Sequence, residues 1–384
     1  MIGTVSFLET KNQKWKKQEQ EGVIAMRTTR EKGIIILNEM GEVWQGVINS
    51  DEMEAKYEKT PLKFGDFPII SISAGVNHFI TLDEDGEVWV WTDGSGNGND
   101  SGQLGQGNTN NITTPTLIPP QDFDQKKVKV IEGGYLQTYV LTEDGTLYGC
   151  GYNNYSNVKP GESNNQTKMN LITNEVDELF PLGTSSYHIF FKKKGGEIGF
   201  LGRNDEGQVG NGTTEHVREI QILNSIKSGP EEIDLSDIKN IFTFLWATFI
   251  LTTKGEVFTS GRQFSCGFPE KKLNFFQMDF PERVIDICGG GYHNLFLSES
   301  GKVWITLDNS QARIPDSILK EKAFDEVFLL PELQIPEIKD LNLQTYSDQD
   351  IPFKLHSGWH LDIAILPNLN FQELVEEDLN DFEF

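Results

Sequence analysis

The sequence is short of cysteine and of positive charge. Its three cysteines, Cys150, Cys266 and Cys288, lie far apart and form no Cys-x-x-Cys pair, so neither a zinc site nor a disulfide framework is predicted. The 33 Lys and Arg residues are outnumbered by 58 Asp and Glu, which gives a formal net charge of −25. Such a surface repels nucleic-acid phosphates and anionic membranes, and we therefore expect no direct binding to nucleic acid and no membrane insertion.

Long apolar runs and catalytic motifs are also missing. No run approaches the ~18 residues of a membrane span, and the first residues lack a signal-peptide pattern, so we expect a soluble intracellular protein of the cytoplasm, the nucleus or a cytoskeletal or ciliary compartment. There is no His-Glu-x-x-His, Gly-x-Ser-x-Gly or kinase signature. The glycine-rich stretch 94–98 lacks the Lys-Ser/Thr and the helix of a phosphate cradle. We therefore expect no enzyme, no cofactor and no metal site.

What the sequence does contain is a repeated unit. A short apolar strand, a turn of small residues, a second apolar strand, a polar turn with glycine and a third strand recur in six copies, of which the clearest runs from Ile72 to Trp91. Glycine is expected in the polar turn because a tight hairpin requires a positive φ. The hairpin-turn glycines of the six copies are Gly41, Gly86, Gly145, Gly196, Gly255 and Gly301.

A seventh copy, at residues 355–367, stops after two strands. The segment Gly3-Thr-Val-Ser-Phe7 has the form of a third strand, like Gly86-Glu-Val-Trp-Val90 in the clearest copy. We therefore predict that residues 3–8 pair with the strand near 361–366 and close a ring. Closure would remove the open sheet edges that otherwise invite aggregation.

Two copies continue beyond the third strand with a shared motif. Residues 99–107 read Asn-Asp-Ser-Gly-Gln-Leu-Gly-Gln-Gly, and residues 204–212 read Asn-Asp-Glu-Gly-Gln-Val-Gly-Asn-Gly. With the Ala74-Gly-x-x-His78 turn, this pattern closely resembles the regulator-of-chromosome-condensation repeat over roughly residues 22–367. The resemblance implies an all-β, seven-bladed propeller with four-stranded blades. It also implies a range of roles, from nucleotide exchange on a small GTPase to chromatin docking and scaffolding, so the fold alone does not define the function.

On this reading the chain divides into four parts. Residues 1–10 are the closing strand, residues 11–21 a basic connector, residues 22–367 the propeller and residues 368–384 an acidic tail. The repeat is interrupted by segments 46–68, 156–180 and 308–350, which we interpret as insertions that carry specific contacts or as plain surface loops. The tail is either a disordered terminus or an amphipathic helix that docks on a basic partner. The apolar residues of its predicted face include Phe371, Leu374, Leu379 and Phe382.

One slot of the repeat holds histidine in four copies. These residues are His78, His188, His293 and His360. A slot repeated around a propeller lies on a circle too wide for four ligands at ~2 Å from one metal ion. We therefore predict a structural role, in which each histidine supports its own turn through a backbone hydrogen bond.

The residue before this slot varies and is the better candidate for function. At this position stand Lys32, Asn77, Leu136, Tyr187, Trp246, Tyr292 and Trp359. Aromatic side chains at a loop rim are common anchors of protein interfaces, but large aromatic rings also plug channels and pack between blades, and both interpretations stay open. In the exchange-factor branch of the resembled family, acidic loop residues help to displace the nucleotide, and here none of the seven positions is acidic.

These observations favour a non-enzymatic scaffold or adaptor subunit of a larger assembly. It would bind protein partners through the propeller-face loops, the insertions and the acidic tail. The alternatives are a guanine-nucleotide exchange factor for a small GTPase and a propeller that associates with histones or chromatin.

Overall fold

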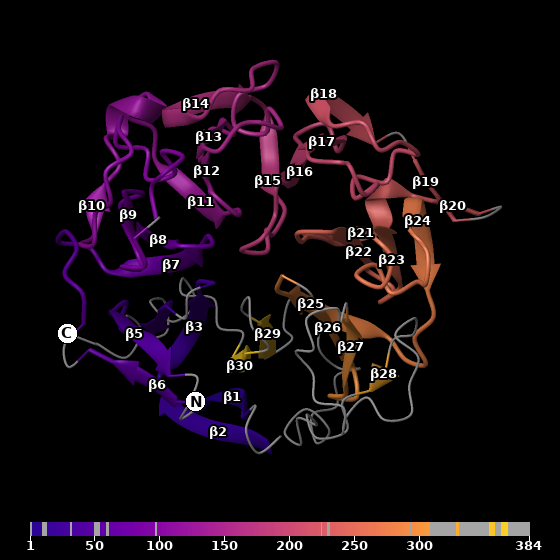
Figure 1. The fold of residues 1–384 in the computed structure, drawn as a ribbon, viewed down its shortest axis with the longest axis horizontal. Helices are drawn as coiled ribbons and strands as arrows, with labels where there is room; N and C mark the ends of the chain where they lie inside the picture. Colours follow the sequence, from indigo (N-terminus) through magenta and orange to yellow (C-terminus); the bar gives the residue numbers. More distant parts are fainter. Residues whose placement is uncertain are drawn as a thin grey trace, which may run out of the picture.

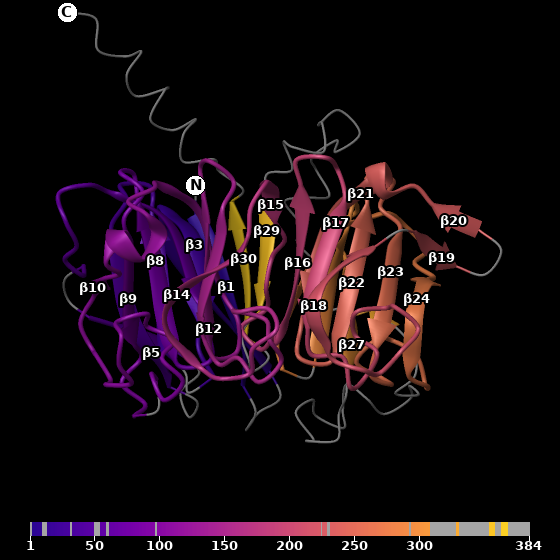
Figure 2. The same cartoon turned by 90° about the horizontal axis from the view of Figure 1, so that it is seen from above.

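The computed structural model describes residues 2–9, 14–30, 33–49, 54–58, 61–96, 98–223, 225–228, 231–291, 293–307, 328–329, 353–357 and 362–367. These residues form small antiparallel sheets that stand around a central axis, like the blades of a propeller (Figure 1). Seen from the side, the strands run roughly parallel to that axis and the loops gather at the two ends (Figure 2). In the described part of the chain, no helix is long and apolar enough to cross a membrane.

Six blades are built from consecutive stretches of the chain. The first blade contains β3 (Val23–Thr28), β4 (Gly33–Asn38), β5 (Val43–Asn49) and β6 (Glu54–Tyr57). The second contains β7 (Ile69–Ala74), β8 (His78–Asp83), β9 (Val88–Thr92) and β10 (Thr116–Leu117). The third contains β11 (Val128–Gly133), β12 (Gln137–Thr142), β13 (Leu147–Gly151) and β14 (Gln166–Thr173). The fourth contains β15 (Val176–Leu179), β16 (His188–Lys193), β17 (Ile198–Gly202) and β18 (Val217–Leu223). The fifth contains β21 (Ile238–Thr243), β22 (Ala247–Thr252), β23 (Val257–Gly261) and β24 (Lys272–Met278). The sixth contains β25 (Val284–Gly289), β26 (His293–Ser298), β27 (Val303–Leu307) and β28 (Phe328–Leu329). We number these blades one to six.

The two ends of the chain together form a further four-stranded sheet. Its order is β2-β1-β30-β29, with β1 at Ile2–Glu9, β2 at Lys14–Glu21, β29 at Phe353–Ser357 and β30 at Asp362–Pro367. Thr4 pairs with Ile365 and Phe7 with Asp362, so the predicted pairing between the N-terminal segment and the last strand is present. The sheet contacts β3 of blade one and β25 of blade six, and it thereby closes the ring.

The prediction of a propeller with seven four-stranded blades was therefore wrong. Only six blades are copies of the repeat. In two of them the fourth strand, β10 or β28, is only two residues long, so these blades have three long strands instead of four. The closing sheet is not a repeat copy that lacks one strand. It takes two strands from each end of the chain, and β2 occupies most of the segment expected to be a basic connector. A second N-terminal strand covers the edge that β1 alone would leave open.

The predicted insertions also have a different character. Segments 46–68 and 156–180 contain β6, β14 and β15, which are blade strands. Of segment 308–350 only Phe328–Leu329 is described. A true addition to the repeat is the two-stranded hairpin β19–β20, Ile226–Ser228 and Glu231–Ile233, which projects beside β24 at the rim of the ring (Figures 1 and 2).

The second strands of the blades are buried on both faces, since each sheet packs between two neighbours. All six residues are buried in each of β8, β12, β22 and β26. One continuous core cluster joins Tyr139 of blade three, Phe190 and Phe200 of blade four and Phe258 and Phe275 of blade five. No blade buries its own faces, and its stability therefore depends on the blades beside it.

The hairpin glycines turn the chain, and four of the six also connect adjacent blades. All six have positive φ, between 75° and 91°. The carbonyl of Gly145 accepts a hydrogen bond at 2.8 Å from Val176 of the next blade, and the carbonyl of Gly41 accepts one at 3.1 Å from Ile69. Gly86 and Gly255 make the same bond to Val128 and Val284. The turn glycine is thus part of the inter-blade contact.

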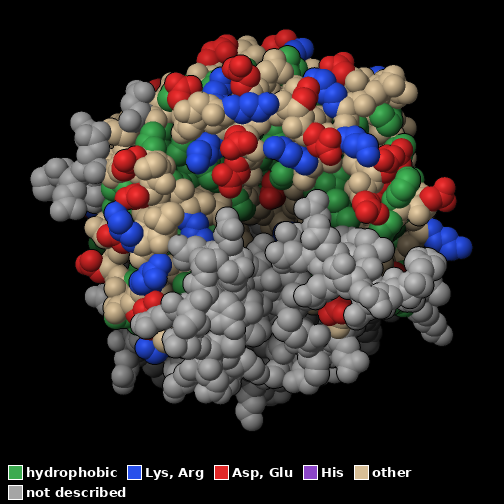
Figure 3. Space-filling view, turned by 180° about the vertical axis from the view of Figure 1, so that it is seen from behind, with side chains coloured by type: hydrophobic (Ala, Val, Ile, Leu, Met, Phe, Trp, Pro, Cys, Tyr) green, Lys and Arg blue, Asp and Glu red, His purple; other side chains and the backbone are tan. Residues whose placement is uncertain are grey.

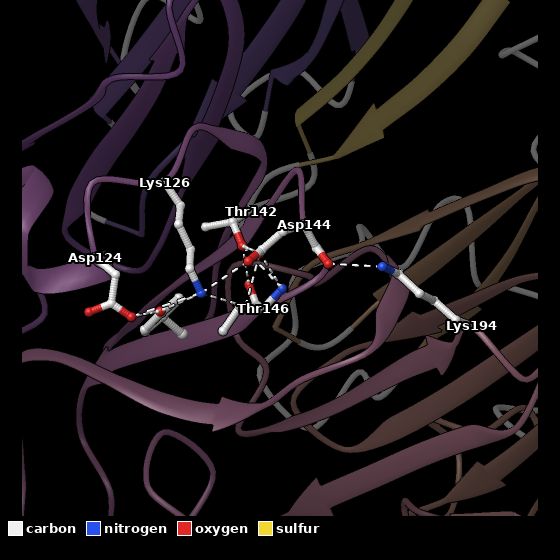
Figure 4. A network of polar contacts seen from close by, with 7 residues as sticks. Asp124, Lys126, Thr142, Asp144, Thr146 and Lys194 are labelled. Carbon is white, nitrogen blue, oxygen red and sulfur yellow. Dashed lines mark hydrogen bonds and ion pairs between the residues drawn. The ribbon is translucent and has the colours of Figure 1, made fainter.

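Charged side chains reinforce this end of blade three (Figure 4). Asp144 accepts from the hydroxyl of Thr142 at 2.6 Å and forms an ion pair with Lys126 at 3.1 Å, while Lys194 of blade four donates to its backbone carbonyl at 2.9 Å. The hydrogen bond from Thr142, followed by those from Lys126 and Thr146, holds the pKa of Asp144 well below its usual value. On the end of the propeller seen in Figure 3, acidic and basic side chains are interspersed over the described part of the surface.

Deletion of residues 1–10 removes β1 and with it the pairing that joins the two chain ends. We expect the melting temperature to fall by roughly 10 °C or more, because both β2 and β30 lose their partner strand. Deletion of residues 1–2 is the control, since pairing with β30 begins at Thr4. Equal melting temperatures for the two deletions would contradict closure by β1.

Gly145→Ala and Gly196→Ala separate the two roles of the turn glycine. Both positions have φ near 90°, so both variants carry a similar backbone cost. A Cβ at Gly145 would lie 2.6 Å from the carbonyl oxygen of Val176, whereas a Cβ at Gly196 would meet nothing within 4 Å. We expect Gly145→Ala to lower the free energy of unfolding by about 1–3 kcal/mol more than Gly196→Ala, measured by denaturant unfolding. If both variants lower the free energy of unfolding equally, the contact of Gly145 with the next blade does not contribute to stability.

Candidate interaction face

Blades two to five each build one end of the propeller with the same backbone bond. The residue that follows the third strand donates its N–H to the carbonyl of the residue before the second strand. The pairs are Asp93 to Asn77 at 3.1 Å, Tyr152 to Leu136 at 2.9 Å, Arg203 to Tyr187 at 3.1 Å and Arg262 to Trp246 at 2.8 Å. The repeat therefore fixes two side chains per blade at this end and leaves their identity free.

The pairs of blades four and five bring arginine onto aromatic rings. The guanidinium carbon of Arg203 lies 4.4 Å from the ring centroid of Trp246, and that of Arg262 lies 4.8 Å from it. Arg203 is also 5.9 Å from the ring centroids of Tyr155 and Tyr187. A guanidinium over an aromatic face is attracted by the ring quadrupole. We call these residues, together with Tyr152, the aromatic–arginine patch.

The patch is held in place by contacts among its members and with the neighbouring residues Asp205 and Tyr135. Arg203 donates through two nitrogens to both carboxylate oxygens of Asp205, at 2.7 and 2.8 Å. Tyr187 stacks on Tyr135 with ring centroids 4.6 Å apart, and the rings of Tyr152 and Tyr155 lie 5.4 and 5.5 Å from it. Burial raises the pKa of the Tyr187 hydroxyl well above its usual value, so the ring stays neutral at physiological pH.

Part of the patch packs on a small apolar cluster. Val76 and Leu245, from blades two and five, are buried in this cluster, and Tyr135, Tyr187 and Trp246 pack against it. Tyr187 and Trp246 are themselves half-buried, and their role as interface anchors stays a prediction. Beside Trp246 lies a cavity of about 10 Å³, about the size that one water molecule needs.

The remaining predicted positions are placed as follows. Leu136 and Asn77 are half-buried at the same end of the propeller. Tyr292, Trp359 and Lys32 lie outside the described residues, as do Phe371, Leu374, Leu379 and Phe382 of the tail. The position after the third strand, which supplies Arg203 and Arg262, was missed from the sequence. Its signal was available, since it follows a recurring glycine at Gly151, Gly202 and Gly261.

The histidines of the repeat reach across to the next blade. Nε2 of His78 lies 3.0 Å from the hydroxyl of Thr138, and Nε2 of His188 lies 2.7 Å from that of Thr248. The Thr138 hydroxyl donates its single hydrogen to the carbonyl of Gln103 at 2.7 Å. It therefore acts as the acceptor towards His78, and Nε2 of His78 is the donor. The expected bond to the histidine's own turn is thus replaced by one between blades. His293 is buried in the same slot, and His360 lies outside the described residues.

The two copies of the Asn-x-x-Gly-Gln motif fold the loop after the third strand. The side-chain oxygen of Asn99 accepts from the N–H of Leu104 at 3.0 Å, and Asn204 accepts from Val209 at 3.0 Å. The backbone carbonyl of Gln208 in turn accepts at 2.9 Å from Ser260 of the next blade, as that of Gln103 does from Thr138. The motif residues therefore maintain the fold and carry no reactive group.

Within the described ranges, no three His, Cys, Asp or Glu side chains lie close enough together to hold a metal ion. The three cysteines are free thiols and are buried.

Comparison with known proteins agrees with this architecture. Residues 85–141 match the family model "Regulator of chromosome condensation (RCC1) repeat". The ultraviolet-B receptor UVR8 of Arabidopsis thaliana is 27% identical over 259 residues, which are 65% of this chain and 56% of the receptor. The guanine nucleotide exchange factor SRM1 of Saccharomyces cerevisiae is 27% identical over 43% of this chain and 35% of the relative. The chain thus spans at most about half of the length of these relatives.

The fold has a close solved counterpart. The crystal structure of Prp20p from Saccharomyces cerevisiae, reported with its binding properties to Gsp1p and histones, superposes with a TM-score of 0.68 at 14% identity and covers 99% of this chain and 95% of that one. The chain is therefore a β-propeller built from repeats. The repeat at residues 85–141, which contains the motif at 99–107, matches the regulator-of-chromosome-condensation (RCC1) repeat, in agreement with the resemblance seen in the sequence.

The inter-blade histidines predict how stability depends on pH. Burial lowers the pKa of His78 to about 4 and that of His188 to about 3, whereas both titrate near ~6.5 in the unfolded chain. Their neutral forms therefore contribute fully above ~pH 6.5, and the contribution is lost as the pH falls towards the folded pKa values. Each histidine accounts for up to about 2 kcal/mol of unfolding free energy between ~pH 6.5 and ~pH 5.

The double variant His78→Gln/His188→Gln tests this dependence. Glutamine fills the same slot at Gln137, so the replacement is one that the repeat already uses. We expect the variant to lose less stability than the unmodified chain between ~pH 7 and ~pH 5 in urea unfolding. Parallel stability–pH curves for the two proteins would show that these histidines are not responsible.

Proposed function

We propose that the chain is a non-enzymatic scaffold or adaptor subunit that binds a protein partner through the aromatic–arginine patch. The observation that carries this proposal is Trp246 with the guanidinium groups of Arg203 and Arg262 on its ring, 4.4 and 4.8 Å from its centroid. Trp, Tyr and Arg are the residues most enriched at the energetic centres of protein interfaces. Here they are gathered on a rigid frame, which lowers the entropy cost of binding.

The arrangement suits contact rather than reaction. The arginines are engaged with aromatic faces, Arg203 also with Asp205, and the Tyr187 hydroxyl is held in its neutral form. What the patch offers to a partner is the partly exposed surface of its aromatic rings and of the guanidinium groups that stack on them. Such a surface packs against a complementary one and orients it through hydrogen bonds at the border.

Nucleotide exchange on a small GTPase is the second candidate. It is supported by the name of the relative SRM1 and by the structural likeness to Prp20p, which was studied with Gsp1p. The described positions before the histidine slot, Asn77, Leu136, Tyr187 and Trp246, bear no acid, but Asp93 and Asp205 lie nearby in the loops after the third strands. Histone binding is a third candidate, since the net charge of −25 attracts basic tails and the Prp20p study names histones.

Affinity capture of the full chain with single variants tests the proposed patch. We expect Arg262→Ala and Trp246→Ala each to lose the partner that the unmodified chain retains, because a truncated interface centre costs about 2 kcal/mol or more. Leu171→Ala is the control: Leu171 is apolar and 49% exposed, but it lies on the outer strand β14. Each variant is first shown to melt like the unmodified chain. Retention of the same partners by both patch variants would contradict the proposal.

A nucleotide-release assay against a panel of small GTPases separates the leading candidate from exchange. We expect no member of the panel to release its nucleotide faster. Stimulation of any member, reduced by Asp205→Ala, would replace the adaptor with an exchange factor that uses the same face.

A further inference from the structure

His216 lies outside the histidine slot of the repeat and borders the aromatic–arginine patch. It stands directly before β18 and is half-buried. Its ring meets that of Tyr155 edge-on, with the ring centroids 4.7 Å apart. Tyr155 in turn lies 5.5 Å from the ring of Tyr187 and 5.9 Å from the guanidinium carbon of Arg203. The ring of His216 is therefore in direct contact with a member of the patch.

A hydrogen bond also joins His216 to the backbone of the patch. Its Nδ1 accepts the backbone N–H of Asn204 at 3.2 Å. Asn204 stands between Arg203 and Asp205, whose side chains are bonded to each other at 2.7 and 2.8 Å. Because a backbone N–H can only donate, Nδ1 has to be unprotonated for this bond to form. The bond fixes the chain between the two charged residues, and only the neutral ring can make it.

Blade three makes the same bond with a group that does not titrate. Asn153 follows Gly151 by two residues, as Asn204 follows Gly202. The N–H of Asn153 donates to Oδ1 of Asn165 at 3.2 Å, and in both blades the acceptor stands 12 residues further along the chain. A carboxamide oxygen accepts at any physiological pH. The fold therefore does not require a histidine at this place, and blade four has a titratable acceptor where an amide serves.

The surroundings of His216 keep its ring neutral at physiological pH. Burial is the largest effect that lowers the pKa of His216, and the guanidinium groups of Arg218 and Arg203 lower it further. The carboxylates of Asp205 and Glu215 act in the opposite direction, and the pKa is lowered on balance. An unperturbed histidine titrates near ~6.5. The hydrogen bond at Nδ1 is thus present at neutral pH and is lost as the pH falls below ~6.5.

We propose that His216 makes partner binding by the aromatic–arginine patch depend on pH. The neutral ring holds Tyr155 and the Arg203–Asp205 pair in the geometry that binds. On acidification Nδ1 takes a proton from solvent, the N–H of Asn204 loses its acceptor, and the imidazolium is repelled by the guanidinium group of Arg203. The patch then loosens on its blade-four side and releases the partner. This regulation rests on the proposed function, whereas the titration of the Asn204 amide is independent of it.

NMR of the full chain tests the hydrogen bond without a partner. We expect the backbone amide resonance of Asn204 to shift as the pH falls below ~6.5. The indole resonance of Trp246, on whose ring Arg203 stacks, should shift with it. His216→Asn introduces the acceptor that blade three uses and should hold both resonances nearly constant over the same range. The histidines of the repeat slot are present in both proteins, so a general effect of acid would appear in both.

Partner binding at two pH values tests the regulation. For the partner captured at ~pH 7.5, we expect the unmodified chain to bind about five-fold or more weakly at ~pH 5, as the loss of one hydrogen bond predicts. His216→Asn should keep the partner at both pH values. His216→Ala, which has no acceptor, should bind about five-fold more weakly already at ~pH 7.5. Melting curves at both pH values confirm that each variant is folded.

Three results would overturn the proposal. The first is an Asn204 amide that does not titrate in the unmodified chain, and the second is a Trp246 indole that stays unchanged while that amide titrates. The third is an equal loss of the partner on acidification by the unmodified chain and by His216→Asn. If no partner is captured through Trp246 and Arg262 at ~pH 7.5, the proposed function fails instead, and the NMR titration still decides whether His216 controls the patch.

Discussion

Every part of this structure depends on the packing of each blade against the next. The second strands are buried on both faces, so a blade removed from the ring would expose two surfaces that its neighbours now cover. Polar contacts follow the same logic, since the carbonyl of Gly145 bonds to Val176 and the ring of His78 bonds to Thr138, in each case in the next blade. A ring held together in this way has to close, and the two chain ends close it jointly in one sheet.

The same frame explains why function can vary without loss of the fold. In each of blades two to five, one backbone bond holds the residue after the third strand against the residue before the second strand, whatever their side chains are. In blade two the pair is Asn77 with Asp93, and in blade five it is Trp246 with Arg262. The packing between blades thus makes the frame rigid, while the half-buried side chains of these pairs differ from blade to blade and can set what the face binds.

Much of the fold was predictable because it depends on local rules. A glycine in each hairpin turn and the pairing of the N-terminal segment with the last strand follow from turn chemistry and from the form of the strands. The number of blades and of strands in each was not predictable in this way. The short strands β10 and β28 and the extra strand β2 lie at the outer edges of their sheets, where the length of a strand depends on the neighbouring segments rather than on the local repeat. The histidine bonds were assigned to the wrong partner, because Thr138 and Thr248 are 60 residues away in the chain.

The sequence by itself determined the repeat, its turns, its family and the aromatic character of the slot before the histidines. These properties are encoded within a few residues of one another, where backbone geometry and apolar patterning act directly. Only the tertiary structure decided that Arg203 and Arg262 stack on Trp246 and that the histidines of the repeat slot link blades. Each of these depends on how two blades approach one another, and that approach is set by side chains distant in the chain that meet only when the ring is complete.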